Sequence, residues 1–295
     1  MRVLLAIDTS PSAQDVICEA ALRPWPKETQ FCILHVINSA TLNRFAALID
    51  KEKELAGGML LSAKEALARA GREVQTEIIF DFPRHGITQF AKNWNADWIL
   101  VGSHGHSAIA RFLLGSVAQA VLRASGCSVE IVRRKSGASM ASSHPMRILL
   151  GTDGSESALA AVRSVAERPW PFGTEIKIIC AVEMFLPVEP GPNMPSVPAY
   201  PVNLLEDIWK SSRERARSAV DEASGLITRA GLPVATGNST PEGDPRVILL
   251  DEAKKWNADL VVLGSHGRRG MDRLLMGSVS ESLALHAPCS VEVVR

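Results

Sequence analysis

Residues 3–10, VLLAIDTS, return later in the chain as residues 148–155, ILLGTDGS. Four further motifs recur in the same order: RPWP at 23–26 and 168–171, WNAD at 94–97 and 256–259, GSHG at 102–105 and 264–267, and CSVE at 127–130 and 289–292. Such self-similarity is the sequence signature of an internal repeat. The spacing is 145 residues for the first two motifs and 162 for the other three, so the second copy carries insertions.

The two copies imply two domains. We place the first domain at residues 1–135 and the second at residues 146–295, close to the usual size of about 150 residues. Residues 136–145 lie in a stretch rich in Ser, Ala and Gly, which predicts a flexible linker. Most of the extra length of the second copy falls in Pro187–Pro201, where six prolines exclude a helix or a central strand. Three roles stay open for this insertion: a lid over a ligand, a cover for the domain interface, and a tolerated surface loop.

The composition excludes several classes of protein. Lys plus Arg and Asp plus Glu both number 32, so the net charge is zero, which argues against a nucleic-acid-binding surface. No apolar run approaches the ~18 residues that a membrane helix needs. The apolar run that opens the chain ends at Asp8 and is too short for a signal peptide, so we predict a cytoplasmic protein. The five cysteines form no C-x-x-C pair, and neither a disulfide framework nor a metal site is indicated.

Short apolar strands alternate with longer helical stretches in each copy. In the first copy the predicted strands are residues 3–7, 30–37, 74–80, 98–101 and 129–132, and the predicted helices are residues 12–22, 46–70, 83–93 and 116–125. This alternation implies a parallel sheet covered on both faces. We therefore predict an α/β fold of two tandem doubly wound, Rossmann-like domains, each with a five-stranded parallel sheet. Ligands bind such sheets beyond the carboxyl ends of the strands, which indicates the positions after Ile7, Val36 and Val101.

After the fourth predicted strand, each copy carries the spacing G-x2-G-x9-G-S. The residues are Gly102, Gly105, Gly115 and Ser116 in the first copy, and Gly264, Gly267, Gly277 and Ser278 in the second. The glycines allow a sharp turn and a close approach of a ligand. We expect each serine to N-cap the next helix, whose amino end offers free N–H groups and a positive dipole. Together these features predict a phosphate-binding cradle, and a tight turn without a ligand is the alternative.

This spacing, after a first strand that ends in Asp, resembles the ATP-binding type of the universal stress protein family. The duplication is similar to the tandem members of that family. The resemblance covers nearly the whole chain, apart from the linker and the proline-rich insertion. It implies a nucleotide-dependent regulator of the stress response that binds ATP, with Mg²⁺, as its cofactor.

The resemblance also assigns roles to residues. Asp8 and Asp153 would contact the adenine, and a backbone group of Val36 or Val182 would meet the base. The full candidate set is Asp8, Thr9, Ser10, Val36, Gly102, His104, Gly105, His106, Gly115, Ser116 and Val117 in the first copy, and Asp153, Gly154, Ser155, Val182, Gly264, His266, Gly267, Arg268, Gly277, Ser278 and Val279 in the second. After the second glycine, Arg268 is a better phosphate partner than His106 at neutral pH. We therefore expect the second site to bind phosphate more tightly.

Two alternative functions stay open. A weak ATPase or adenylate-transferring enzyme would use the same site, although the P-loop motif G-x4-G-K-[ST] is absent. No catalytic residue is assigned, because His104 and His266 have no neighbouring nucleophile or carboxylate pair and a structural role is favoured. A nucleotide-free interaction scaffold, in which neither site retains a ligand, is the second alternative. For Asp8 and Asp153, capping of the following helix, contact with a ligand, and both together stay open.

The last strands of the two copies are nearly identical in sequence. An edge strand exposes unpaired backbone groups unless another strand or segment covers it. We therefore predict that Ser128–Arg133 pairs with Ser290–Arg295 and relates the two domains by a pseudo-twofold axis. The family resemblance also implies such edge pairing in dimers, so a homodimer of the whole chain is a further expectation.

Overall fold

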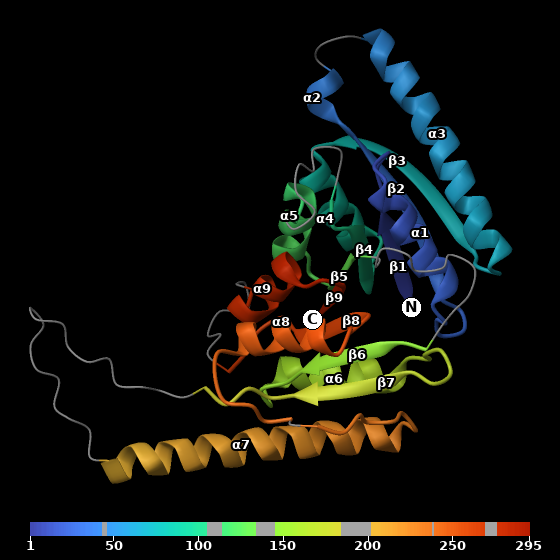
Figure 1. The fold of residues 1–295 in the computed structure, drawn as a ribbon. Helices are drawn as coiled ribbons and strands as arrows, with labels where there is room; N and C mark the ends of the chain where they lie inside the picture. Colours follow the sequence, from blue (N-terminus) through green and yellow to red (C-terminus); the bar gives the residue numbers. More distant parts are fainter. Residues whose placement is uncertain (43–45, 105–113, 134–144, 184–201, 238, 269–275) are drawn as a thin grey trace, which may run out of the picture.

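The computed structural model describes residues 1–42, 46–104, 114–133, 145–183, 202–237, 239–268 and 276–295 (Figure 1). The first half contains β1 (Arg2–Ala6), α1 (Ser12–Leu22), β2 (Gln30–Asn38), α2 (Ser39–Leu42), α3 (Ala46–Arg69), β3 (Val74–Asp81), α4 (Pro83–Asn93), β4 (Trp98–Gly102), α5 (Ser116–Ala124) and β5 (Ser128–Val132). The second half contains β6 (Arg147–Gly151), α6 (Glu156–Glu167), β7 (Glu175–Ile179), α7 (Val202–Arg229), α8 (Pro245–Lys255), β8 (Leu260–Gly264), α9 (Ser278–His286) and β9 (Ser290–Val294). Among the helices of these ranges, none is long and apolar enough to cross a membrane.

The strands of both halves join in one sheet. Its order is β3-β2-β1-β4-β5-β9-β8-β6-β7, and the pairs within each half are parallel. In each half the first strand lies in the middle and the chain winds outward in both directions from it. This topology confirms the predicted α/β fold of two tandem doubly wound domains.

Alternate side chains of each strand enter two cores on opposite faces of the sheet. From β1, Val3 and Leu5 pack in one core with Val16 of α1, while Leu4 packs in the other core with Val121 of α5. Helices therefore cover both faces of the sheet (Figure 1).

The outer edge of the second half differs from the prediction of five strands. In the first half, β3 pairs with β2 over eight residue pairs. In the second half, the segment that follows α7 forms no continuous strand in the described residues. It makes two isolated parallel bridges, Ile176 to Val234 and Val182 to Glu242. Gly237 and Pro241 explain the break, because Gly237 has φ +146° and proline has no N–H for the ladder.

The cap positions of α5 and α9 also differ from the prediction. Gly115 and Gly277 are the N-cap residues, with ψ near 140–146°, and neither helix has a side-chain cap. Ser116 and Ser278 are the first helical residues, so the prediction that these serines cap the helices is wrong. A residue inside the first turn has helical dihedrals, and its hydroxyl is not placed to accept from the next N–H groups.

The two halves meet where β5 and β9 lie side by side in antiparallel orientation. The residue pairs are Val129 with Val293, Glu130 with Glu292 and Ile131 with Val291. At each end of this contact a serine hydroxyl accepts from the backbone of the other half. Arg133 N donates to Ser290 Oγ over 3.0 Å, and Arg295 N donates to Ser128 Oγ over 3.2 Å.

A buried cluster of charged side chains lies on one face of this contact. Glu130 and Glu292 are both 0% exposed. Arg23 donates two hydrogen bonds of 2.7 Å to Glu130, and Arg168 donates bonds of 3.0 and 2.7 Å to Glu292. These contacts explain two of the repeated motifs together, because the arginine of RPWP pairs with the glutamate of CSVE.

The pH dependence of stability follows from Glu130. Complete burial, together with the carboxylate of Glu19, outweighs Arg23 and raises the pKa of Glu130 to about 7. Between its ordinary pKa of 4.5 and this value, the folded chain holds a proton that the unfolded chain releases, so stability falls as pH rises. We expect the free energy of unfolding to drop by about 1 kcal/mol from pH 6 to pH 8 because of this residue.

Denaturant unfolding at both pH values, in the wild type and in Glu130→Gln, checks this prediction. The variant has no carboxyl group to titrate, so its pH dependence should be smaller by that amount. Equal pH dependence in the two proteins would show that Glu130 does not titrate in this range.

Candidate functional site

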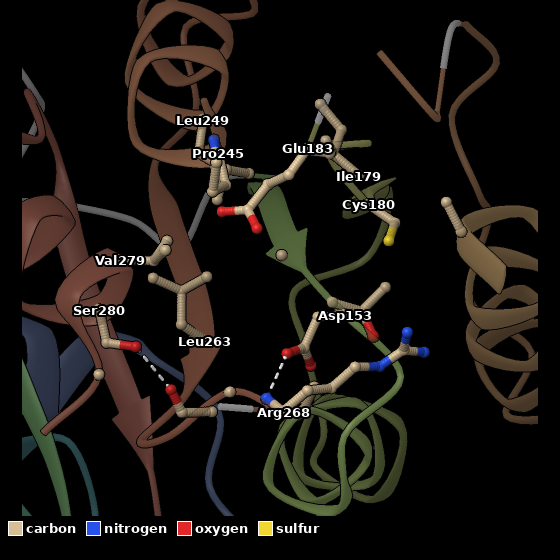
Figure 2. A pocket seen from close by; sticks show the side chains of 18 of the residues that line it. Asp153, Ile179, Cys180, Glu183, Pro245, Leu249, Leu263, Arg268, Val279 and Ser280 are labelled. Carbon is tan, nitrogen blue, oxygen red and sulfur yellow. Dashed lines mark hydrogen bonds between the residues drawn. The ribbon is translucent and has the colours of Figure 1, made fainter. Parts of the chain in front are cut away.

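The second half has a cavity of about 820 Å³ at the carboxyl ends of β6, β7 and β8 (Figure 2). We call it the second-half cavity. It is lined by the ends of those strands, the turn after β8, the amino ends of α8 and α9, and the inner face of α7. The lining residues are Gly151, Thr152, Asp153, Ala158, Ile179–Glu183, Ile208, Ser212, Arg215, Ala216, Pro245, Leu249, Leu263, Gly264, His266–Arg268 and Met276–Ser280.

Asp153 ties two sides of this cavity together. Its Oδ1 accepts from Ser155 N over 2.9 Å, and its Oδ2 accepts from Arg268 N over 2.9 Å. The loop after β6 is thereby fixed to the turn after β8, as the dashed line in Figure 2 shows. A Cβ at Gly267 would lie 2.9 Å from Asp153 Oδ2, so a larger residue here would displace this carboxylate.

The first glycine of each pattern serves the packing of the fold. A Cβ at Gly264 would lie 2.5–2.7 Å from backbone atoms of Ser157 and Ala158, at the start of α6. In the first half, a Cβ at Gly102 would collide with the side chain of Ser12 at the start of α1. Both glycines therefore let a helix approach a neighbouring strand closely, α1 approaching β4 and α6 approaching β8, and this packing is an additional reason for the glycine motif.

The amino end of α9 faces the second-half cavity. The first intrahelical bond runs from Glu281 N to Gly277 O, so the N–H groups of Ser278, Val279 and Ser280 have no acceptor within the helix. Their free N–H groups and the helix dipole favour an anion at this end. The hydroxyl of Ser280 is already used, because it donates to Gly264 O over 2.6 Å (Figure 2).

The charged and ionisable groups in the wall of the second-half cavity include those of Asp153, Glu183, Arg268 and Cys180. Figure 2 shows the carboxyl groups of Asp153 and Glu183 on opposite sides of it, with Arg268 beside Asp153. Burial, with a smaller contribution from Asp153, raises the pKa of the Cys180 thiol to about 11 despite the nearby Arg268. This thiol therefore stays protonated at neutral pH and is a poor nucleophile.

Most of the second-half candidates from the sequence line the cavity. They are Asp153, Val182, Gly264, His266, Gly267, Arg268, Gly277, Ser278 and Val279. Gly154 and Ser155 are not among the lining residues. Gly154 has φ +73° and packs under Arg268, while Ser155 caps α6 by accepting from Ala158 N over 3.3 Å. The cap of α6 is therefore Ser155 and not Asp153.

The sequence predicts the same role for Val36 and Val182 in the two halves, but the strand register does not place them at equivalent positions. Ala6 pairs with Leu34 in the first half, and Gly151 pairs with Ile179 in the second. By this register, Val36 corresponds to Ala181. Val182 uses its backbone elsewhere, since its N donates to Pro241 O over 2.8 Å and its O accepts from Gly243 N over 3.0 Å. Ala181 and Val182 both line the cavity.

The first half repeats part of this arrangement. Asp8 Oδ1 accepts from Ser10 N over 3.0 Å and from the Ser10 hydroxyl, and the hydroxyls of Ser10 and Ser12 both donate to His104 O. The N-cap of α1 is Pro11, so Asp8 does not cap this helix.

The remaining first-half candidates take different places. Thr9 is exposed, Ser116 and Val117 begin α5, and Val36 lies on β2. Gly105 and His106 lie outside the described residues, as do residues 136–144 of the predicted linker and the Pro187–Pro201 insertion.

The two histidines of the GSHG motifs have the same surroundings in both halves. Nδ1 of His104 lies 2.8 Å from Ser103 Oγ, and Nδ1 of His266 lies 2.8 Å from Ser265 Oγ. Their Nε2 atoms are buried without a hydrogen-bond partner among the described residues. The structural role of the two histidines therefore stays a prediction.

Sequence reasoning missed the wall of the cavity that α7 provides. Ile208, Ser212, Arg215 and Ala216 line the cavity from this helix, and Cys180 and Glu183 line it from the β7 side. These residues belong to no repeated motif. The available signal was the pair of helix stops at Gly71 and Gly231, which aligns α7 with α3.

Comparison with known proteins agrees with this architecture. Residues 1–133 and 145–295 each match the universal stress protein family. A universal stress protein of Mycolicibacterium smegmatis is 26% identical over 303 residues, covering 99% of this chain and 96% of that protein. One from Mycobacterium tuberculosis is 25% identical over 311 residues, with the same coverage. The crystal structure of a universal stress protein from Archaeoglobus fulgidus has the same fold, with a TM-score of 0.65 at 22% identity over 100% of this chain and 96% of that one. The resemblance inferred from the glycine motif is thereby confirmed.

Proposed function

Since this chain belongs to the universal stress protein family, we propose that its second half binds ATP in the second-half cavity and that the bound nucleotide regulates a stress response. Membership of the family itself supports a role in stress responses. The observation that carries the nucleotide proposal is the cavity, where the free amino end of α9, the glycine turn and Arg268 converge. Backbone donors and an arginine are the groups that proteins use to hold phosphates.

The residues divide into two groups by their chemistry. The carboxylate of Asp153 and the backbone of Ala181 would meet the adenine ring, since the N and O of Val182 are already bonded to Pro241 and Gly243. Gly267, Arg268 and the amino end of α9 offer positive charge and N–H groups for phosphates. Mg²⁺ binds chiefly to phosphate oxygens and water and needs few protein ligands. It would therefore enter with the nucleotide.

The first half would hold a second nucleotide at Asp8, Thr9, Ser10, Val36, Gly102, His104, Gly105, His106, Gly115, Ser116 and Val117. Its affinity would be lower, because the sequence has His106 where the second half has Arg268. The two proposed nucleotide sites lie on one continuous sheet. Binding at one site would therefore affect the other site through the β5–β9 contact.

Arg268 gives the sharpest test of this proposal. A charge-assisted hydrogen bond contributes about 1.5–3 kcal/mol, so Arg268→Ala should weaken ATP binding at the second-half site by at least about tenfold. Isothermal titration calorimetry of the full chain measures this change. Arg163→Ala removes the same charge from an exposed position on α6, outside the cavity, and serves as the matched control. Equal ATP affinity in the Arg268 and Arg163 variants would refute the assignment.

A further inference from the structure

The helices α3 and α7 occupy the same place in the two halves. Their buried positions match at a constant spacing: Ala56 with Ala216, Leu60 with Val220, Ala63 with Ala223 and Leu67 with Ile227. Residues between these positions must correspond in the same way, because the same face of each helix packs on the sheet. Arg215 therefore corresponds to the exposed Leu55, and Ser212 corresponds to Glu52.

Arg215 is held at the wall of the second-half cavity. Its Nη1 donates to Ser211 Oγ over 2.8 Å, and its Nη2 donates to Ser212 Oγ over 2.9 Å. Arg215 and Ser212 both line the cavity. The two serines restrict the long side chain, which lowers the entropy lost when the guanidinium binds a ligand.

Arg268 reaches the same wall from the opposite side. A Cβ placed at Gly154 would lie 2.9 Å from Arg268 Nη2 and 3.1 Å from the Cβ of Ala219. The guanidinium of Arg268 and the side chain of Ala219 therefore both border Gly154, and Ala219 follows Arg215 by one turn of α7. Figure 2 shows this side chain extending away from the turn after β8 toward α7.

We infer that Arg215 and Arg268 together make the second-half site selective for ligands with several negative charges, so that it prefers a nucleoside triphosphate over a monophosphate. This inference rests on the proposed nucleotide binding and adds a selectivity residue, Arg215, to that site. Guanidinium groups form strong charge-assisted bonds with phosphate oxygens. The sequence of the first half offers Leu55, Glu52 and His106 at the corresponding positions, so this selectivity belongs to the second half alone.

Titration of the full chain with ATP and with AMP tests the inference. Arg215→Leu installs the residue that the first half carries at this position. We expect ATP binding at the second-half site, identified as the site weakened by Arg268→Ala, to weaken about tenfold. AMP binding there should change less than about twofold, because AMP carries fewer phosphate charges. Arg217→Leu removes an exposed arginine two residues further along α7, outside the cavity lining, and should leave both affinities unchanged.

Three results overturn the inference in different ways. Unchanged ATP affinity in Arg215→Leu shows that the arginine does not contact the ligand, while the proposed nucleotide binding stands. Equal losses for ATP and AMP show that Arg215 supports the cavity without selecting charge. A wild-type chain that binds neither nucleotide removes the proposed function together with this inference.

Discussion

Arg168→Ala is expected to lower the free energy of unfolding by about 3–5 kcal/mol, because it leaves a buried carboxylate without its partner. Glu292 is fully buried and accepts two hydrogen bonds from Arg168. The remaining guanidinium, that of Arg23, lies 4.0 Å from Glu292 and already binds Glu130. It cannot replace the lost bonds without giving up its own.

The variant also removes contacts with two aromatic rings. The guanidinium carbon of Arg168 lies 4.5 Å from the ring centre of Trp98 and 4.8 Å from that of Trp170. Such contacts contribute about 0.5–1 kcal/mol at exposed sites and about 2 kcal/mol when they are desolvated. Denaturant unfolding followed by tryptophan fluorescence measures the total loss.

Arg123 provides a matched control for this experiment. It forms an ion pair with Glu281 that also connects the two halves, but its side chain is 56% exposed. Exposed pairs contribute about 0–1 kcal/mol, so Arg123→Ala should change stability by less than about 1 kcal/mol. Equal effects of the two variants would contradict the account of the buried cluster.

Gly264→Ala is the second substitution with a large expected effect. The new Cβ would lie 2.5–2.7 Å from backbone atoms of Ser157 and Ala158, which cannot move aside as a flexible side chain could. The start of α6 must shift away from β8, and the bond from Ser157 Oγ to His266 O must lengthen or break. Overpacking of this kind costs about 1–3 kcal/mol and occasionally more. We expect a loss near 3 kcal/mol, with weaker nucleotide binding because His266 lies in the wall of the cavity.

Gly57→Ala is the control for the glycine substitution. Nothing lies within 4 Å of a Cβ at Gly57, which is inside α3. Alanine favours a helix by about 1 kcal/mol over glycine, so this variant should be as stable as the wild type or more so. A Gly264→Ala protein that unfolds at the same denaturant concentration as the wild type would refute the packing argument.

The sequence predicts the duplication and the alternation of strands and helices because both depend on local patterns. The repeated WNAD motif is equally local, since Asn95 and Asn257 take left-handed dihedrals just after α4 and α8. The link between RPWP and CSVE is not local. Arg23 and Glu130 are 107 residues apart, and neither motif alone shows that the two side chains meet. Only the register of the folded sheet brings them together.

The candidate site shows the same limit. The glycine pattern identifies the turn after β8 and the amino end of α9, because each depends on consecutive residues. The contribution of Arg215 depends on which face of α7 packs inward, and this face becomes apparent only from the burial of Ala216, Val220 and Ala223. The shortened edge of the second half was missed for a similar reason, because its apolar residues suggested a strand and its glycine and proline broke the ladder.

Identification of the small molecule that the purified protein carries tests the central claim most directly. The protein is denatured, and the released ligand is identified and counted by chromatography and mass spectrometry, before and after incubation with Mg-ATP. The account predicts an adenine nucleotide at one or two molecules per chain, with the second-half cavity filled first. A chain that releases no nucleotide, and takes up none after incubation with Mg-ATP, would contradict the account.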